Sequence, residues 1–262
     1  MVIQKIKISD KEFVEQYKEF NLAHRYIICE ACLKSFDFGN IAVRKSIGIE
    51  VIFQYIGMLE DTAMIYYALK EKSKHKSFFK SLSEISIKEH LNSEYTSKKI
   101  HKELEELEKI SFEDFIKKLN LPLPKEAVKF AEASLINDLG GQEKAQEQYK
   151  KETIEFLKNI KNAIRNRFHD KKGGDLDLVK IYNKIKHGSI FINDETNEES
   201  VYFPITKKIE VLDEQGKEVQ TEAYNLICNK KEELQNLVNQ MKLLSDNLKN
   251  LLKIFCLYNY SS

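Results

Sequence analysis

Residues that break regular structure are scarce in this chain, and their scarcity limits the folds that it can adopt. Only nine glycines and three prolines occur in 262 residues, whereas these two residues together average roughly 12% of a protein. A β-sandwich needs many tight turns, and glycine and proline supply most of them. Lys, Glu, Leu and Ile are abundant instead. The sequence therefore predicts a mainly α fold, built as a helical bundle.

Capping residues and breakers divide the chain into helical segments. Ser9 and Ser111 precede acidic residues, as helix N-caps do. The segment Leu121-Pro122-Leu123-Pro124 cannot continue a helix, because proline lacks the backbone N–H and clashes with the preceding turn. A second break, 137–141, ends in two glycines. We expect helices over residues 10–36, 41–72, 77–90, 94–110, 111–120, 125–136, 142–169, 175–187 and 223–258.

One region departs from the helical pattern. Residues 201–205 and 209–212 are rich in β-branched and aromatic residues, and the turn-forming segment 213–216 follows them. We therefore expect a small β-hairpin at about 199–220. Two strands alone are only marginally stable, so we expect the hairpin to be inserted in one helical domain that spans 1–262. The prolines at 121–124 mark a sub-boundary within that domain.

Neither the start of the chain nor its most apolar region has the pattern of a membrane segment. Residues 1–7 alternate apolar and polar side chains, unlike the hydrophobic core of a signal peptide. Glu50, Glu60 and Asp61 interrupt the apolar region 47–69, whereas a membrane-spanning helix needs about 20 nearly uncharged residues. Four cysteines are too few for a disulfide scaffold. We expect a cytoplasmic protein that does not associate with a membrane.

Positive charge is concentrated in one part of a nearly neutral chain. The formal net charge is +1, but residues 158–187 contain nine Lys or Arg and three Asp. When residues 156–169 are placed on a helix, their apolar side chains form one arc and most of the cations fall on the opposite side. Arg165 and His169 are four residues apart and therefore neighbours on that side. This polar face comprises Lys158, Lys161, Asn162, Arg165 and His169.

The expected helix 175–187 repeats this arrangement. Its polar side gathers Lys180, Asn183, Lys184 and His187. His187 lies in the last turn, where the helix dipole favours the imidazolium form. Histidine can transfer a proton near neutral pH, and Lys or Arg can hold a phosphate and stabilise its developing charge. The two faces therefore suit chemistry on a phosphodiester.

The segment Arg165-Asn166-Arg167-Phe168-His169 resembles the signature of the HEPN superfamily (higher eukaryotes and prokaryotes nucleotide-binding). That signature is an Arg, usually followed by a polar residue such as Asn, and then a His after four to six intervening positions. Here three residues intervene. The later segment YNKIKHG, at 182–188, is similar to one found in divergent HEPN-like bacterial proteins. This segment contains His187 but has no Arg at the expected distance, and Lys180 stands six intervening residues before His187.

This resemblance implies an all-helical RNA-binding protein and a metal-independent ribonuclease of a toxin or phage-defence system, with no cofactor. Arg165, His169 and His187 would be the catalytic residues, with a histidine taking the proton of the ribose 2′-hydroxyl and Arg165 holding the phosphate. The residues expected to bind RNA are Lys158, Lys161, Asn166, Lys180, Asn183 and Lys184. HEPN protomers pair to bring two motifs to one cleft. We therefore expect a homodimer, for which the apolar segment 49–69 offers surface, and an antitoxin protein as a further partner.

A second hypothesis is a non-catalytic helical interaction protein whose basic face is incidental. Arg and His four residues apart arise easily by chance in a chain with many cations. His187 precedes Gly188 and could simply bond the last carbonyls of its helix. Cys29-Glu30-Ala31-Cys32 has the spacing of a zinc-ligand pair, but no second pair accompanies it. We expect buried free thiols there and no metal site.

Overall fold

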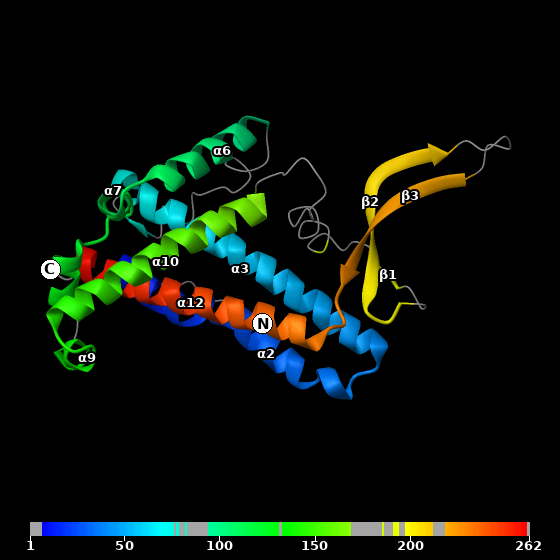
Figure 1. Ribbon diagram of the computed structural model, residues 1–262, viewed down its shortest axis with the longest axis horizontal. Helices are drawn as coiled ribbons and strands as arrows, with labels where there is room; N and C mark the ends of the chain where they lie inside the picture. Colours follow the sequence, from blue (N-terminus) through cyan, green and yellow to red (C-terminus); the bar gives the residue numbers. More distant parts are fainter. Residues whose placement is uncertain are drawn as a thin grey trace. The chain divides into compact units, whose positions relative to one another are not determined.

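The structure is a computed structural model that describes residues 7–75, 77–78, 82, 94–130, 133–168, 185, 191–193, 197–211 and 218–260. Helices dominate it, and a small antiparallel sheet precedes the last helix (Figure 1). The predicted mainly α fold with a small inserted hairpin is confirmed. The helices are α1 (Asp10–Gln16), α2 (His24–Lys34), α3 (Ile41–His75), α6 (Glu94–Lys109), α7 (Phe112–Lys118), α8 (Pro124–Ala127), α9 (Ala133–Asp138), α10 (Gln142–Phe168) and α12 (Lys231–Tyr260). The strands are β1 (Ile192–Asn193), β2 (Ser200–Val211) and β3 (Glu218–Ile227).

Local signals place most helix boundaries as expected. Ser9 caps α1 and Ser111 caps α7, each accepting a hydrogen bond from the backbone N–H three residues later. Pro124 is the first residue of α8, where its missing N–H costs nothing. Gly140 ends α9 with φ of 84°, and its N–H and that of Gly141 bond back into the helix. No described helix combines the length and the apolar character needed to cross a membrane.

The first expected helix is not continuous. Instead of one helix over 10–36, α1 is followed by a π-helical turn (Tyr17–Asn21), then by α2 and a 3₁₀ turn (Phe36–Phe38). The π-helical turn carries Lys18, which is buried and pairs with Glu15 one turn earlier. A π-helical turn leaves no signal in the capping residues or in the hydrophobic spacing, so the sequence predicted one longer helix.

The hairpin is longer than expected and the last helix is shorter. The predicted strand 201–205 and the described part of the predicted strand 209–212, residues 209–211, belong to β2, which has a register irregularity between Pro204 and Lys208. Its antiparallel partner is β3, whose Ile227 lies opposite Ser200, and the predicted turn 213–216 lies outside the described residues. Residues 223–227 are therefore strand and not helix, because they satisfy the backbone groups of β2. The two-residue strand β1 pairs with the other edge of β2.

The chain divides into two compact units, each built from segments distant in sequence. Unit 1 contains Met1–His24, Met58–Asp170 and Lys242–Ser262, and unit 2 contains Arg25–Gly57 and Lys171–Met241. The long helices α3 and α12 contribute one part to each unit. The segment 121–124, expected as a sub-boundary, lies inside unit 1, after α7 and up to the first residue of α8. The assignment of 1–262 to a single domain stays a prediction.

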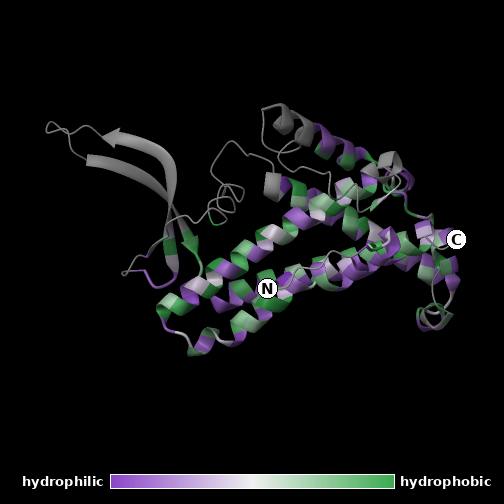
Figure 2. Cartoon of the chain, turned by 180° about the vertical axis from the view of Figure 1, so that it is seen from behind, coloured by the Kyte–Doolittle hydropathy of each residue, from purple (hydrophilic) through white to green (hydrophobic). Residues whose placement is uncertain are grey.

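The core of unit 1 is formed by aromatic and aliphatic side chains. Phe115 of α7 packs on Phe156 of α10, with ring centroids 6.3 Å apart. Phe78 packs on Phe255 of α12, with ring centroids 5.7 Å apart. All four rings are buried, and burial of a side chain of this size stabilises the fold by about 1.5–3 kcal/mol. Figure 2 shows the hydrophobic and hydrophilic residues that alternate along the long helices.

A largely buried carboxylate connects three helices of unit 1. Glu103 of α6 accepts hydrogen bonds from Tyr66 and Lys70 of α3 and from Lys118 of α7. The Lys70 and Lys118 ammonium nitrogens lie 2.6 and 3.0 Å from its carboxylate oxygens, and the Glu103 side chain is 12% exposed. Because every donor comes from another helix, this cluster fixes α6 against α3 and α7.

The environment of Glu103 keeps it ionised. Burial raises the pKa of Glu103, but the hydrogen bonds from Lys70 and Tyr66 and the charge of Lys70 outweigh burial and lower the pKa below its ordinary value of 4.5. Burial, together with the neighbouring carboxylate, raises the pKa of Tyr66 far above its ordinary value, so its hydroxyl remains a donor.

In unit 2 a buried lysine holds a loop against α3. The ammonium group of Lys45 donates to the side chain of Asn193 at 2.7 Å and to the carbonyl of Asn197 at 2.8 Å, and Lys45 is buried. One turn later, Gly48 lies directly against the backbone of Cys228. A Cβ at position 48 would stand 1.7 Å from the Cys228 carbonyl oxygen, so only glycine fits there.

We predict that Glu103→Gln lowers the free energy of unfolding at pH 7 by about 3 kcal/mol, because it leaves two lysines without their buried counter-charge. The control is Glu106→Gln, which removes a half-exposed contact with Lys118 and should cost no more than about 1 kcal/mol. Denaturant titrations measure both.

The same substitution has an expected pH dependence. The pKa of Glu103 is lowered in the folded protein, so its contribution is present above its ordinary value of 4.5 and is lost as the pH falls through the lowered pKa. The difference in stability between wild type and Glu103→Gln should shrink over that range. Equal stability of the two proteins at pH 7 would contradict the role given to this carboxylate.

Candidate functional site

The C-terminal half of α10 separates a buried side from a charged side. Phe156, Ile160, Ala163 and Ile164 are each at most 1% exposed and face the core of unit 1. The predicted apolar arc is confirmed at these positions. On the other side of the helix lie Lys158 and Asn162, which are exposed, and Lys161 and Arg165, which are half-buried. The chain therefore has no packing reason to carry three cations there, since the opposite side supplies the core contacts.

Arg165 joins α10 to α6. Its guanidinium donates to the Glu108 carboxylate at 3.0 Å, and the two side chains are 40% and 52% exposed. A guanidinium has five N–H donors, and this contact uses one of them. The geometry therefore holds Arg165 on the surface and leaves donors that a second acceptor can reach.

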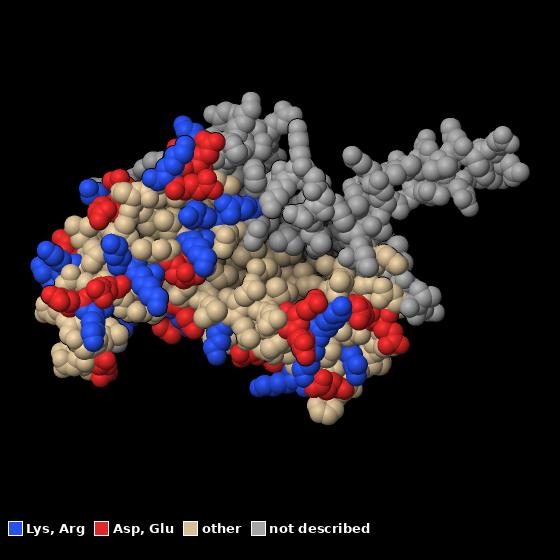
Figure 3. All heavy atoms as spheres, viewed as in Figure 1, with Lys and Arg blue, Asp and Glu red and all other residues tan. Residues whose placement is uncertain are grey.

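The remaining described cations of this face are weakly engaged. Lys158 lies 3.4 Å from Glu155 one turn earlier, and both side chains are largely exposed. Such pairs contribute only about 0–1 kcal/mol, so an anionic ligand can replace the carboxylate at little cost. Figure 3 shows positive and negative side chains side by side over α6 and α10. We call Lys158, Lys161, Asn162 and Arg165 the α10 polar face.

Some of the predicted site residues belong to the described part of the chain, and others do not. Lys158, Lys161 and Arg165 lie together on α10. Asn166 belongs to the same helix by its backbone, and its side chain lies outside the described part. The residues that lie wholly outside the described part are His169, Lys180, Asn183, Lys184 and His187. The catalytic and binding roles expected of all these residues stay predictions.

Sequence reasoning missed Glu108, the partner of Arg165. The two residues are 57 positions apart, and the second half of α6 carries Glu at four positions, 103, 105, 106 and 108. No local pattern singles out one of these four, although a glutamate-rich helix in a chain with a basic stripe is a signal for pairing. Which glutamate pairs is decided by the rotation of α6, and the Glu103 cluster sets that rotation.

The two cysteines of α2 are free thiols in a structural setting. Cys29 is fully buried and Cys32 half-buried. Burial raises the pKa of Cys29 to about 12, with smaller contributions from Cys32 and Glu50, and burial also raises the pKa of Cys32. A thiol with a raised pKa is a poor nucleophile at neutral pH. Within the described residues, no group of three or more His, Cys, Asp or Glu side chains is arranged to hold a metal ion.

Comparisons with known proteins identify no related protein. No protein-family model matches the chain, and no significant match is found among curated proteins or solved structures. What the chain does is therefore inferred from the residues of the α10 polar face and from the sequence pattern around it.

Proposed function

We propose that this protein is a HEPN-like RNA-binding protein that contacts RNA through the α10 polar face and cleaves it without a metal ion. The observation that carries the proposal is the set of three cations on the side of α10 opposite its buried residues. Because residues 165–169 resemble the HEPN signature, we assign these cations a common role, contact with a phosphodiester.

The spacing of the cations suits a phosphate backbone. Lys158, Lys161 and Arg165 follow one another at intervals of three and four residues, so they lie along one side of the helix. Seven residues separate the first from the last, which corresponds to about 10.5 Å along the helix axis. The C-terminal half of α10, 156–168, contains four Lys or Arg and no Asp or Glu. An extended polyanion is the ligand that such a row complements best.

Arg165 is the residue best suited to a single phosphate. Its planar guanidinium can donate two parallel hydrogen bonds to a phosphate, which an ammonium group cannot do. In the free protein Glu108 occupies one donor. Because the pair is exposed, its contribution of at most about 1 kcal/mol is small enough for a phosphate to displace the carboxylate.

For cleavage, we propose that the ribose 2′-hydroxyl attacks the adjacent phosphorus and the 5′-oxygen leaves. His169 or His187 takes the proton from the 2′-hydroxyl, and the other returns a proton to the leaving oxygen. Arg165 stabilises the additional charge on the phosphate oxygens. Arg165 and His169 are assigned these roles because they are four residues apart in a segment similar to the HEPN signature.

The protein partners in this proposal are a second copy of the chain and an antitoxin protein. The apolar segment 49–69 does not support the pairing, because the chain itself buries most of it, including Val51, Ile56 and Leu69. Unit 2 instead exposes Ile27, Ile28 and Phe38, at 51%, 41% and 91%. Contiguous exposed apolar surface marks protein interfaces, and we propose these three side chains as part of the pairing surface.

The RNA-binding part predicts a specific salt dependence. For wild type, the logarithm of affinity for a single-stranded RNA should fall linearly with the logarithm of salt concentration. The triple variant Lys158→Gln, Lys161→Gln, Arg165→Gln should lower that slope by about 2, because each lost phosphate contact accounts for about 0.7. Fluorescence anisotropy at several salt concentrations measures both slopes.

A matched control separates this surface from net charge. The variant Lys11→Gln, Lys125→Gln, Lys129→Gln removes three exposed cations of unit 1, none of which lies on α10. It should leave the slope nearly unchanged, and both triple variants should keep the wild-type melting temperature. Equal slopes for wild type and the α10 variant would place RNA binding elsewhere.

The cleavage part predicts activity in EDTA. Purified wild-type protein should cut RNA and leave 2′,3′-cyclic phosphate ends, because no metal takes part. His169→Ala or His187→Ala should slow cutting by about 100-fold or more, the usual contribution of a general acid or base. Arg165→Ala should slow cutting without preventing folding, since Arg165 is on the surface.

Two outcomes would contradict this part. Equal cutting by wild type and all three variants would identify a contaminating nuclease. Salt-dependent RNA binding without any cutting would show that the chain binds RNA but is not a nuclease, which is the outcome that favours the interaction-protein hypothesis.

A further inference from the structure

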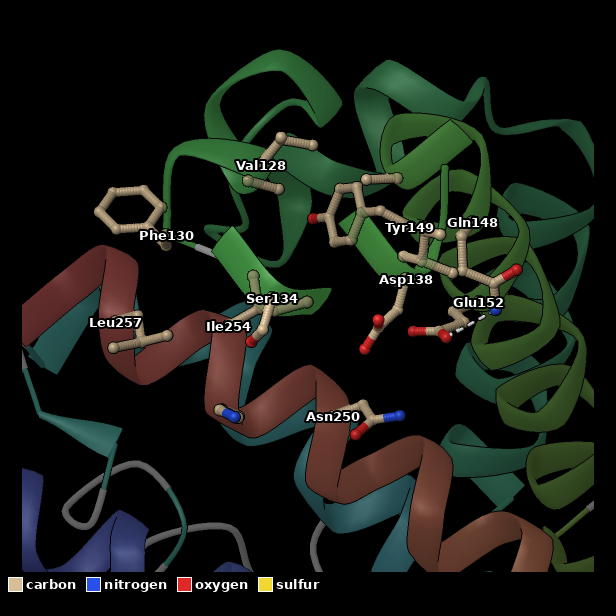
Figure 4. A pocket seen from close by; sticks show the side chains of 14 residues that line it. Val128, Phe130, Ser134, Asp138, Gln148, Tyr149, Glu152, Asn250, Ile254 and Leu257 are labelled. Atoms are coloured by element: carbon tan, nitrogen blue, oxygen red, sulfur yellow. Dashed lines mark hydrogen bonds between the residues drawn. The ribbon is translucent and has the colours of Figure 1, made fainter. Parts of the chain in front are cut away.

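A groove in unit 1 lies apart from the α10 polar face. It encloses about 630 Å³ between the segment 127–139, the first half of α10 and the last part of α12 (Figure 4). This volume is in the range of small-molecule sites, roughly 300–1,000 Å³. The residues that line it are Ala127, Val128, Phe130, Ser134, Asp138, Leu139, Ala145, Gln148, Tyr149, Glu152, Asn250, Lys253, Ile254 and Leu257.

Much of the groove wall is apolar. Val128 lies on one side, and Ile254 and Leu257 of α12 lie on the other (Figure 4). Tyr149 is buried, and its hydroxyl donates to the carbonyl of Pro122 at 2.8 Å. The polar end of Tyr149 is thereby satisfied by the protein, so its ring serves as an apolar surface. Phe130 stacks edge-on against Tyr258, with centroids 6.0 Å apart. These contacts fix the wall before any ligand binds.

Two carboxylates face the open space from different helices. Figure 4 shows Asp138 of α9 and Glu152 of α10 projecting into the groove toward one another. Glu152 is held by Gln148, whose amide donates to it at 2.8 Å. Within the described part of the chain, the Asp138 carboxylate has no hydrogen-bond or ion-pair partner. The Gly140 turn that ends α9 fixes the position of Asp138 beside α10.

The carboxylates outnumber the cations among the described residues of the groove. Asn250 and Ser134 are uncharged, and Lys253 is the one cation among the described lining residues. The described lining therefore has a net negative charge, together with a largely apolar wall. A ligand that matches both must carry a positive group on an apolar body.

We propose that this groove binds a small organic cation, a primary amine on an aromatic or aliphatic body. The ammonium group lies between Asp138 and Glu152, where charge-assisted hydrogen bonds are strongest. The body packs against Val128, Ile254 and the ring of Tyr149. A bare metal ion would not use the apolar wall, and an anion would be repelled by the carboxylates. This proposal is independent of RNA binding, because it involves other residues of α10.

The experiment uses the full-length chain and three probes of the same shape. These are phenethylamine, the neutral 2-phenylethanol and the anion 3-phenylpropionate, and isothermal titration calorimetry measures their affinities. We expect phenethylamine to bind at least tenfold more tightly than 2-phenylethanol, and 3-phenylpropionate not to bind. Asp138→Asn and Glu152→Gln should each weaken phenethylamine binding about tenfold, the usual effect of losing one charge-assisted bond.

The control variant is Glu147→Gln, which removes an exposed carboxylate of α10 that does not line the groove. It should leave the affinity for phenethylamine unchanged. Asp138 is exposed and Glu152 half-buried, so both variants should keep the wild-type melting temperature. Three results would overturn the proposal: no binding of phenethylamine, equal binding of 2-phenylethanol, or unchanged affinity in the double variant Asp138→Asn, Glu152→Gln.

Discussion

The carboxylate of Glu103 is the interaction on which the candidate site depends. It receives hydrogen bonds from α3 and α7, and so it fixes both the position of α6 and its rotation about its axis. Glu108 follows five residues later, about 7.5 Å along the same helix, and holds the guanidinium of Arg165. A buried charged group is costly unless it is paired, so this cluster permits one rotation of α6 and disfavours others. The position of Arg165 relative to α6 thus depends on the hydrogen bonds of Glu103, about one and a half turns before Glu108 on α6.

Helix α10 carries two surfaces with opposite preferences. Its first half contributes Glu152 and Gln148 to the groove, and its second half presents Lys158, Lys161 and Arg165. Arg165 lies in the last turn of α10, where the helix dipole favours a cation, so its position is also consistent with the stability of α10. The two proposals for this helix concern different ligands, an RNA phosphate and an organic cation, and each can fail without the other.

The parts of the fold that sequence could predict are those set by neighbours in the chain. Ser9, Ser111, Pro124 and Gly140 act on their own turns, and the structure confirms the boundaries that they mark. The sequence predicted residues 223–227 as helix, but they form a strand. That strand depends on pairing with residues 200–204, which the local sequence does not reveal. The Glu103 cluster and the Arg165–Glu108 pair join residues 15 to 57 positions apart, so spacing alone could not identify them. The apolar and charged sides of α10 followed from helical periodicity, which is why the face could be predicted while its partner could not.

The central claim is that RNA lies against the α10 polar face, and photo-crosslinking tests it most directly. RNA that contains 4-thiouridine would be irradiated with the full-length protein, and the attached peptides would be identified by mass spectrometry. We predict adducts on peptides from residues 158–165, and their loss in the variant Lys158→Gln, Lys161→Gln, Arg165→Gln. Adducts confined to other segments, or unchanged adducts in that variant, would contradict the claim.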